Sequence, residues 1–434
     1  MPNTIFEFKV KARTEQVAAI EEAIRTAQFI RNKCIRLWMD SRGITQYDLS
    51  AYCKVLAKEF KFAGELNSMA RQASADRAWS SISRFYDNCK KQISGKKGYP
   101  QFKKHSRSVE YKTTGWKLSE NKKDITFTDK KGIGKLKLIG TYDLNYYQLD
   151  QIKRVRLVRR ADGYYCQFIV AVEVKVEVEP TKQVVGLDVG LKEFYTDSNG
   201  HAEPNPRFYR QGEKKLKRLQ RRLSRKYDKK RRTKGERQSN NYHKARNRLA
   251  RQHLKISRQR EEHAKRLARC VITSNDVVVY EDLKVRNLVK NHCLAKSIQD
   301  AGWYQFRRWI EQFGQKMGKV TVAVPPHYTS QECSNCKALV KKSLSTRTHK
   351  CQCGCELDRD LNAAINILKR GLSTVGRQPP LPPFEYEGGQ TCFAFIQGTW
   401  VQDTLNAWGE STSTAVGEIQ QGQVDSLNQE SPDF

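Results

Sequence analysis

Two periodicities of apolar residues divide the N-terminal part of the chain. Residues 5–12, IFEFKVKA, alternate apolar and polar side chains, which predicts a β-strand. Residues 14–38 place apolar side chains near helical spacing, and helical sequence continues after them. Residues 101–178 return to alternation, with a strong hairpin turn at Ala161-Asp162-Gly163. We expect a small β-barrel-like domain, residues 1–13 and 98–180, interrupted by a helical domain, residues 14–97.

Strands alternate with helices between residues 181 and 372, which indicates an α/β domain. VVGLDVGLKEFYTDSNG predicts two strands, and residues 213–270 predict a long basic helical block with a thin apolar stripe. A strand at 276–283, an amphipathic helix at 301–318, the strand KVTVAV and a helix at 360–370 follow. From residue 373 the chain is acidic and rich in Pro, Gly, Gln and Ser, so residues 373–434 are predicted to be a disordered tail.

The charge distribution favours a nucleic-acid partner. The 434 residues include 80 basic and 46 acidic side chains, for a net charge of +34. Every basic residue lies at or before Arg377. So many basic side chains repel one another unless a polyanion neutralises them. The basic block 213–270 therefore indicates a surface that binds the backbone phosphates of a nucleic acid. A solvated pair of helices and a ribosomal-type basic protein are the alternatives.

Aromatic residues with basic neighbours could add base stacking to this surface. They occur in four places, although each is individually more typical of a core: Tyr99-Pro-Gln-Phe102-Lys-Lys, Tyr111-Lys, Trp116-Lys and Trp303-Tyr304-Gln-Phe306-Arg-Arg.

The chain contains no run of about 18 apolar residues, so no membrane span is expected. The charged start, MPNTIFEFKVKART, lacks the apolar block of a secretory signal. We expect a cytoplasmic protein that is not secreted.

Five of the twelve cysteines cluster near the C-terminal end of the α/β domain. Cys333 and Cys336 form one knuckle, and Cys351 and Cys353 form a second one, with the intervening residues as a β-ribbon. Two short cysteine turns are the ligand pattern of a structural zinc site. Cys355 is a rival for the fourth position, and His349 is a weaker one. We expect a zinc ribbon at residues 327–357.

Three acids far apart in the sequence form a second candidate constellation. Asp188 lies within an apolar strand, Glu281 ends another, and Asp360 stands in the first turn of the last helix. That helix is expected to pack on the sheet through one apolar face, formed by Leu361, Ala364, Ile365 and Leu368.

A buried acid is costly unless it has a partner. Singly, Asp188 could be a turn residue, Glu281 an ordinary strand end and Asp360 a helix cap. Jointly they match the arrangement with which RNase H-type sheets bind two magnesium ions, which hard carboxylates suit. Asp282 and Asp358 are predicted to support the site or to cap elements.

Four segments carry a resemblance to a known family. GLDVGLKEF, VVVYEDLKVRNLVKN, HYTSQECSNC and CELDRDLNAAINIL, in this order, resemble the TnpB proteins of bacterial insertion sequences, which are related to type V CRISPR nucleases. The resemblance spans residues 1 to about 372. Two departures stand at the zinc knuckles: Cys351 lies one residue too close to Asp360, and Lys337 stands where the family usually has Gly.

The resemblance implies a fold and a function. The fold would be an RNase H-like (RuvC) nuclease domain at 181–372 with a zinc ribbon insertion. It would also contain an N-terminal wedge-like β-barrel, interrupted by a helical recognition domain. The activity would be RNA-guided, magnesium-dependent cleavage of double-stranded DNA next to a short flanking motif. The guide RNA would come from the transposon end, and we expect a bacterial, nucleoid-associated monomer.

The family's functional residues fall on the residues already selected. Its catalytic trio, which holds two magnesium ions, falls on Asp188, Glu281 and Asp360. Its zinc ligands fall on Cys333, Cys336, Cys351 and Cys353.

Three other functions remain open from the sequence. A guided DNA-binding regulator without cleavage would be expected to lack acids of the trio, and all three are present here. A strand-transferring transposase uses a similar trio and would yield joined strands instead of free ends. A basic RNA chaperone-like protein with a structural zinc would show no magnesium-dependent activity.

Overall fold

The computed structural model describes residues 3–130, 132–172, 175–343 and 346–375, and the predicted tail after 375 lies outside these residues. The described residues form two compact units that divide near residue 173. Each unit is described by itself. No helix of the described residues is both long and apolar enough to cross a bilayer.

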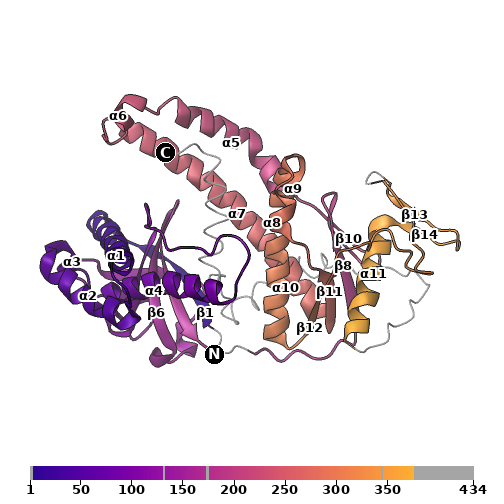
Figure 1. Ribbon diagram of the computed structural model, residues 1–434, viewed down its shortest axis with the longest axis horizontal. Coiled ribbons are helices and arrows are strands. Elements are labelled where there is room, and N and C mark those ends of the chain that lie inside the picture. Colours follow the sequence, from indigo (N-terminus) through magenta and orange to yellow (C-terminus); the bar gives the residue numbers. More distant parts are fainter. Residues whose placement is uncertain (1–2, 131, 173–174, 344–345, 376–434) are drawn as a thin grey trace. The chain divides into compact units, whose positions relative to one another are not determined.

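A seven-stranded sheet forms the centre of the first unit (Figure 1). The strand order is β2-β6-β7-β1-β5-β4-β3, so the first strand of the chain lies in the middle, antiparallel to β5 and β7. The strands are β1 (Asn3–Lys11), β2 (Ser108–Lys112), β3 (Trp116–Leu118), β4 (Asp124–Phe127), β5 (Gly134–Ile139), β6 (Ile152–Arg160) and β7 (Gly163–Ala171).

The hairpin predicted at 161–163 is confirmed, because Arg160 pairs with Gly163 where β6 turns into β7. The predicted β-barrel is not observed. β2 and β3 are the two edges of the sheet, and no ladder joins them within the described residues. β3 and β4 have only three and four residues, which leaves few backbone groups for a closing ladder.

Four helices separate β1 from the rest of the sheet: α1 (Thr14–Asp40), α2 (Gln46–Glu59), α3 (Lys61–Glu65) and α4 (Ser68–Lys90). α1 begins at the predicted Thr14, and its side chains Ile20, Ile24 and Ile30 are fully or almost fully buried. They share one core with the inner face of the sheet. Three short 3-10 helices lie between strands: η1 (Thr113–Gly115), η2 (Leu144–Tyr146) and η3 (Leu149–Gln151).

The second unit has a five-stranded mixed sheet with the order β10-β9-β8-β11-β12. β8, β9 and β10 are antiparallel neighbours, whereas β11 runs parallel to both β8 and β12. The strands are β8 (Val184–Val189), β9 (Glu193–Asp197), β10 (Ala202–Pro204), β11 (Val277–Glu281) and β12 (Val320–Val324).

Helices cover this sheet and extend from it. They are α5 (Phe208–Ser224), α6 (Lys229–Thr233), α7 (Asn240–Ser274), α8 (Val285–Leu288), α9 (His292–Ala301), α10 (Trp303–Met317) and α11 (Arg359–Thr374). α7 packs against α5 and α10, and α11 packs on β8 and β11 (Figure 1). The basic block of the sequence is therefore a helical hairpin attached to an α/β sheet.

A small two-stranded ribbon, β13 (Thr348–Lys350) and β14 (Glu356–Asp358), precedes α11. The sequence predicted a ribbon between the two cysteine knuckles. The observed ladder instead flanks the second knuckle, with Lys350 opposite Glu356. The short Cys351–Cys355 segment makes the turn, closed by the Cys351 N–H donating to the Cys355 carbonyl at 2.9 Å.

Candidate metal centres

The parallel pairing of β8 and β11 brings two of the predicted acids to one end of the sheet. Leu187 lies opposite Tyr280 in the ladder. The next residues along the two strands are Asp188 and Glu281, and neighbouring strands lie about 4.8 Å apart. Asp188 is thus on the central strand of the sheet, as predicted, and Glu281 ends the adjacent strand.

Two glycines allow α11 to lie against these strands. A Cβ added at Gly186 of β8 would be 2.3 Å from the Ala364 carbonyl oxygen, and one at Gly371 of α11 would be 2.3 Å from the Val279 side chain. Such approaches exclude any larger residue. α11 therefore runs across β8 and β11 with its first turn, which carries Asp360, in the region of the strand ends.

Asp360 is bound by arginines in the structure. Arg359 donates to Asp360 Oδ1 through Nε at 2.9 Å and Nη2 at 2.8 Å, and Arg347 donates to Oδ2 at 3.3 Å. The helix cap is Asp358, whose carboxylate accepts from the backbone N–H groups of Asp360 and Leu361. Asp360 is therefore not the cap of α11, and its carboxylate is directed to charged partners.

The negative charges of Glu281 and Asp360 act on Asp188. Burial, followed by the negative charges of Glu281 and Asp360, raises the pKa of Asp188 well above its ordinary value. Burial also raises the pKa of Glu281, while a hydrogen bond from Thr329 Oγ1 at 2.6 Å opposes that rise. A nearby cation would remove the repulsion between these groups.

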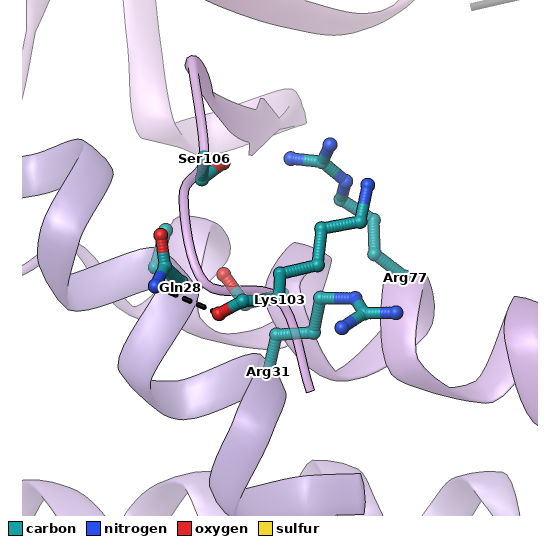
Figure 2. A pocket seen from close by; sticks show the side chains of 7 residues that line it. Gln28, Arg31, Arg77, Lys103 and Ser106 are labelled. Carbon is teal, nitrogen blue, oxygen red and sulfur yellow. Dashed lines mark hydrogen bonds between the residues drawn. The ribbon is translucent and has the colours of Figure 1, made fainter. Parts of the chain in front are cut away.

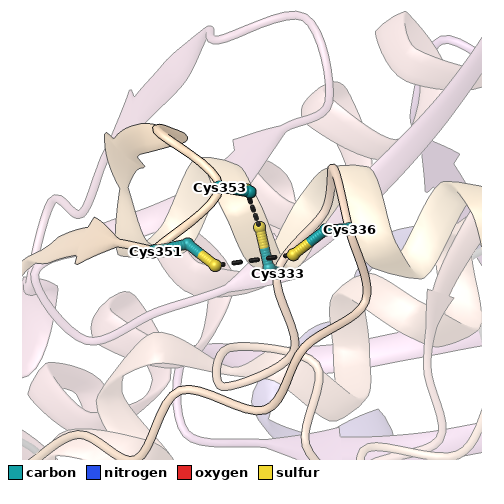
Figure 3. Close-up of side chains that lie close together, drawn as sticks. All are labelled: Cys333, Cys336, Cys351 and Cys353. Atoms are coloured by element: carbon teal, nitrogen blue, oxygen red, sulfur yellow. Dashed lines mark hydrogen bonds between the residues drawn. The ribbon is translucent and has the colours of Figure 1, made fainter.

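The predicted zinc ligands come together in the structure (Figure 3). The sulfur atoms of Cys333, Cys336, Cys351 and Cys353 all lie within 4.8 Å of one another. Cys333 Sγ lies 3.7 Å from Cys353 Sγ, and Cys336 Sγ lies 3.5 Å from Cys351 Sγ. A tetrahedral zinc with Zn–S bonds of about 2.3 Å separates its sulfurs by about 3.8 Å. The four side chains therefore fit this ion, whereas the acid trio does not form an equally tight group within the described residues.

The knuckle backbone favours ionised thiols. Burial opposes ionisation of Cys333, but the backbone N–H groups of Cys336 and Asn335 lower the pKa of Cys333 to about 5. The backbone N–H of Cys355 lowers the pKa of Cys353 in the same way. Thiolates are the form that binds zinc.

The two alternative zinc ligands predicted from the sequence, Cys355 and His349, lie beside the four-sulfur group. Cys355 lies beside Cys333 but is not a member of the four-sulfur group. His349 is fully buried; its Nδ1 contacts the Lys342 ammonium, and its Nε2 has no nitrogen or oxygen partner.

Lys337, where a glycine was expected from the resemblance, has a φ of +65°. This left-handed conformation is the one that glycine adopts without strain. The position after Cys336 thus keeps the backbone conformation of a knuckle although its side chain differs.

The buried face of α11 overlaps only in part with the predicted one: Ala364 is fully buried, and Leu368 packs against Gly186 of β8. Leu361, Ile365 and Leu368 are only half buried. The fully buried positions include two polar residues and are Asn362, Ala363, Ala364, Asn366, Ile367, Gly371 and Leu372. The buried face is centred to one side of the predicted apolar stripe, because Asn362 and Asn366 occupy part of it.

These asparagines tie the first cysteine knuckle to α11. The Asn362 side chain accepts from the Ser334 N–H at 2.9 Å and donates to the Glu332 carbonyl at 2.8 Å. Asn366 donates to the carbonyls of Thr329 and Glu332 at 2.9 and 2.7 Å. Sequence reasoning missed Asn362, Asn366 and Thr329, although two asparagines at i and i+4 in an apolar helix were a usable signal.

Asp282, predicted to support the site or to cap an element, forms an ion pair with Arg307. Arg307 also bonds Glu311 at 2.8 Å, and its guanidinium lies over the ring of Tyr280, 5.5 Å from the centroid. This network fixes the chain immediately after Glu281.

The helical hairpin of α5 and α7 presents a basic surface. Leu216 and Leu223 of α5 pack with Tyr242 and Leu249 of α7, which leaves the opposite side of α5 in solvent. The only acid of α5, Glu213, pairs with Lys217 at 2.9 Å and with Lys296 at 2.6 Å. Exposed basic residues of α5 and its end are Arg210, Lys214, Lys215, Lys217, Arg218, Arg221, Arg222 and Arg225.

Two family models and several relatives match parts of the chain. The OrfB_IS605 model, described as "Probable transposase", matches residues 167–292, and the "Cas12f1-like, TNB domain" model matches residues 303–367. A Streptomyces pristinaespiralis protein named "Putative RNA-guided DNA endonuclease" is 27% identical over 382 residues, which cover 85% of this chain and 89% of that protein. Escherichia coli InsQ, with the same description, is 32% identical over 237 residues, 51% of this chain and 57% of InsQ.

A solved structure shares the fold. "Structure of the mini-RNA-guided endonuclease CRISPR-Cas_phi3" aligns with a TM-score of 0.50 and 9% identity, covering 88% of this chain and 94% of that one. The first family model includes Asp188 and Glu281, and the second includes all four clustered cysteines and Asp360. The chain is thus similar to the OrfB_IS605 family over residues 167–292 and to the Cas12f1-like TNB domain over residues 303–367.

Proposed function

We propose that this chain is a transposon-associated, RNA-guided DNA endonuclease that cuts target DNA next to a short flanking motif. The observation that carries the proposal is the meeting of β8, β11 and the first turn of α11, which directs Asp188, Glu281 and Asp360 to one end of a mixed sheet. The descriptions of its relatives in Streptomyces and Escherichia coli agree with this function.

The three carboxylates would hold two magnesium ions. Their chemistry fits, since magnesium prefers oxygen ligands and Asp188 and Glu281 are half-buried acids whose repulsion a cation would relieve. When bound, such a pair supplies charge stabilisation and an activated water for phosphodiester hydrolysis. Thr329 orients Glu281 by its hydrogen bond, and Arg347 and Arg359 hold Asp360.

The cysteine cluster would hold a structural zinc. Its four sulfurs leave no open position for a substrate, so the ion would maintain shape instead of performing chemistry. The knuckle that it closes is hydrogen-bonded to Asn362 and Asn366 of α11. Zinc would therefore help to position the helix that carries Asp360.

The remaining basic surface would bind nucleic acid. Guided nucleases leave sequence recognition to base pairing between guide RNA and target, while the protein binds the backbone and a short motif. The hairpin of α5 and α7 suits backbone phosphates. Residues 1–13 and 98–180 would form the wedge domain, residues 14–97 the recognition domain, and residues 181–372 the RuvC-like nuclease domain.

The test is cleavage by protein purified with its co-expressed transposon-end RNA. Wild type should cut target DNA only with magnesium and guide, and Asp188→Ala should reduce the rate by at least 1,000-fold, on the order of the loss of a metal ligand. Glu193→Gln, which alters an acid of the neighbouring strand β9, is the matched control and should cut normally. Equal cutting by wild type and Asp188→Ala would place the site elsewhere.

Strand transfer is the second candidate, because the matching family model is described as a transposase. The two reactions differ in product. Sequencing of the DNA ends decides between them: free ends support the endonuclease, and strands joined to a new site support the transposase.

A further inference from the structure

An exposed tyrosine, Tyr328, lies beside the candidate magnesium site, and its side chain is 61% exposed. It belongs to the loop of residues 325–330, between β12 and the first cysteine knuckle. The next residue, Thr329, is buried and donates to Glu281 Oε1 at 2.6 Å. Consecutive Cα atoms are about 3.8 Å apart and a threonine side chain is short, so the Tyr328 Cα lies within about 9 Å of that carboxylate oxygen. The tyrosine therefore stands at the border of the candidate site.

The backbone of Tyr328 is in the left-handed region, with a φ of +59°. This conformation is unfavourable for a bulky side chain and persists only where the surrounding structure imposes it. Glycine and asparagine adopt it more readily. The chain thus has a large ring at a position where the backbone alone favours a small residue, which indicates a role for the ring itself.

Contacts on both sides of Tyr328 impose this conformation. The Tyr328 carbonyl accepts from the Glu332 N–H at 2.9 Å. Arg370 of α11 donates to the His327 carbonyl at 2.6 Å and pairs with the Glu332 carboxylate at 2.5 Å. These bonds hold the loop, so the ring is in place before any ligand arrives.

The side chain of Tyr328 has no partner of its own: among the described residues, no hydrogen bond, ring contact or cation contact involves it. Phe102, an exposed ring of the first unit, differs in this respect. Its loop is also held, since Gln28 donates to the Lys103 carbonyl at 2.9 Å (Figure 2). The Arg36 guanidinium, however, lies over the Phe102 ring, 5.4 Å from the centroid. The Tyr328 ring is therefore the more accessible surface for stacking.

We propose that Tyr328 stacks on an unpaired base of the DNA strand that is cut, within three nucleotides of the scissile phosphate. Aromatic side chains stack on all four bases, because every base has a π-face. Bases stack about 3.4 Å apart along a strand, so the distance of about 9 Å from Glu281 corresponds to one to three nucleotides. The inference rests on the proposed function, because it concerns the strand that reaches the three acids.

The first test measures cleavage by protein purified with its transposon-end RNA. The DNA targets each lack one base, at successive positions within four nucleotides of the mapped cut. Tyr328→Asn removes the ring but suits the left-handed backbone, and Tyr328→Phe retains the ring. Lys182→Asn, at an exposed residue of the same unit with a φ of +60°, is the matched control.

Tyr328→Asn should cut the intact target about tenfold more slowly than wild type, on the order of one lost stacking contact. Tyr328→Phe and Lys182→Asn should cut at the wild-type rate. At one position, removal of the base should slow wild type about tenfold but not slow Tyr328→Asn further, because ring and base form one interaction. Equal sensitivity of both proteins at every position would overturn the proposal.

Urea unfolding separates this effect from a loss of folding. Tyr328→Asn should be at least as stable as wild type, because asparagine relieves the backbone strain. A slower Tyr328→Asn with unimpaired stability and the position-specific response to a missing base is the expected combination.

The second test does not depend on cleavage. The fluorescent base 2-aminopurine is placed in a single-stranded DNA and in an RNA of the same sequence, and its quenching by stacking is measured in calcium without magnesium. Wild type should quench the DNA probe more strongly than Tyr328→Asn, and ring-dependent quenching of RNA alone would contradict the proposal. Ring-dependent quenching by a protein that cuts no DNA would retain the stacking site while the endonuclease proposal fails. Cleavage by wild type with equal quenching in both proteins would reject the stacking site alone.

Discussion

Cys351, Cys353 and Cys355 alternate along the chain, yet only the first two belong to the four-sulfur group. The backbone turn explains why Cys355 is outside the group. The Cys351 N–H donates to the Cys355 carbonyl, and Cys355 then lies near Cys333 but outside the tetrahedron of sulfurs. The buried His349 beside this group contacts the Lys342 ammonium through Nδ1, an interaction that spacing alone does not reveal.

The cysteine geometry makes a stoichiometric prediction. Purified wild type and Cys355→Ser should each contain one zinc per chain, whereas Cys351→Ser should contain much less than one, because only Cys351 supplies a ligand. Inductively coupled plasma mass spectrometry measures this directly. Zinc loss in Cys355→Ser with full zinc in Cys351→Ser would show that the ligand assignment is wrong.

A half-buried histidine, His263, predicts acid sensitivity of the second unit. His263 of α7 lies against Phe194 and Phe208, with ring centroids 4.9 and 5.8 Å apart, and burial lowers the pKa of His263 to about 4. In the unfolded chain the histidine titrates near pH 6.5. The contribution of neutral His263 to the unfolding free energy is therefore complete above pH 6.5 and is lost as the pH falls toward 4. The loss is at most about 3 kcal/mol.

Urea unfolding at pH 7.5 and pH 5 tests this prediction. His263→Phe should reduce the difference in unfolding free energy between the two conditions, while His292→Gln, at an exposed position, should not. Equal pH dependence in wild type and His263→Phe would contradict the assignment.

At the scale of elements, α11 links the two candidate metal centres. Its first turn carries Asp360, its buried asparagines hold the cysteine knuckle, and its small residues contact β8 and β11. Helical periodicity predicted that this helix packs on a sheet, but not where its buried face is centred. Asn362 and Asn366 override the apolar pattern because they satisfy backbone groups of residues 329–334.

The close contact of α11 and β8 predicts the effect of one methyl group. Gly186→Ala should lower the unfolding free energy by about 3 kcal/mol, because its Cβ meets the rigid Ala364 carbonyl, and should reduce cleavage by displacing Asp360. Gly235→Ala, in open space at a φ of +70°, should cost only about 1 kcal/mol and leave cleavage intact. Similar denaturation midpoints for both variants would argue against tight docking of α11.

At the scale of the whole molecule, single strands and hairpins were easier to predict from the sequence than the closure of a sheet into a barrel. The alternation in IFEFKVKA predicted β1, and the Ala161-Asp162-Gly163 turn predicted the β6–β7 hairpin. The sequence could not predict that β3 and β4 would be too short to close a barrel, because closure depends on pairing between distant strands.

The acids were selected from their unusual positions in apolar segments, since a carboxylate there requires a partner. Thr329 could not be selected in this way, because threonine at a loop position is unremarkable in a sequence and its bond to Glu281 depends on tertiary structure. The register of β8 and β11 likewise emerges only once both strands are in one sheet.

The central claim is that Asp188, Glu281 and Asp360 share a pair of divalent cations. The most direct measurement is an anomalous difference map, at the manganese absorption edge, of the protein bound to guide RNA and target DNA in manganese. The account predicts two peaks about 3.5–4 Å apart, each within bonding distance of Asp188 and at least one other carboxylate of the trio. Ordered side chains with no peak beside these three carboxylates would contradict it.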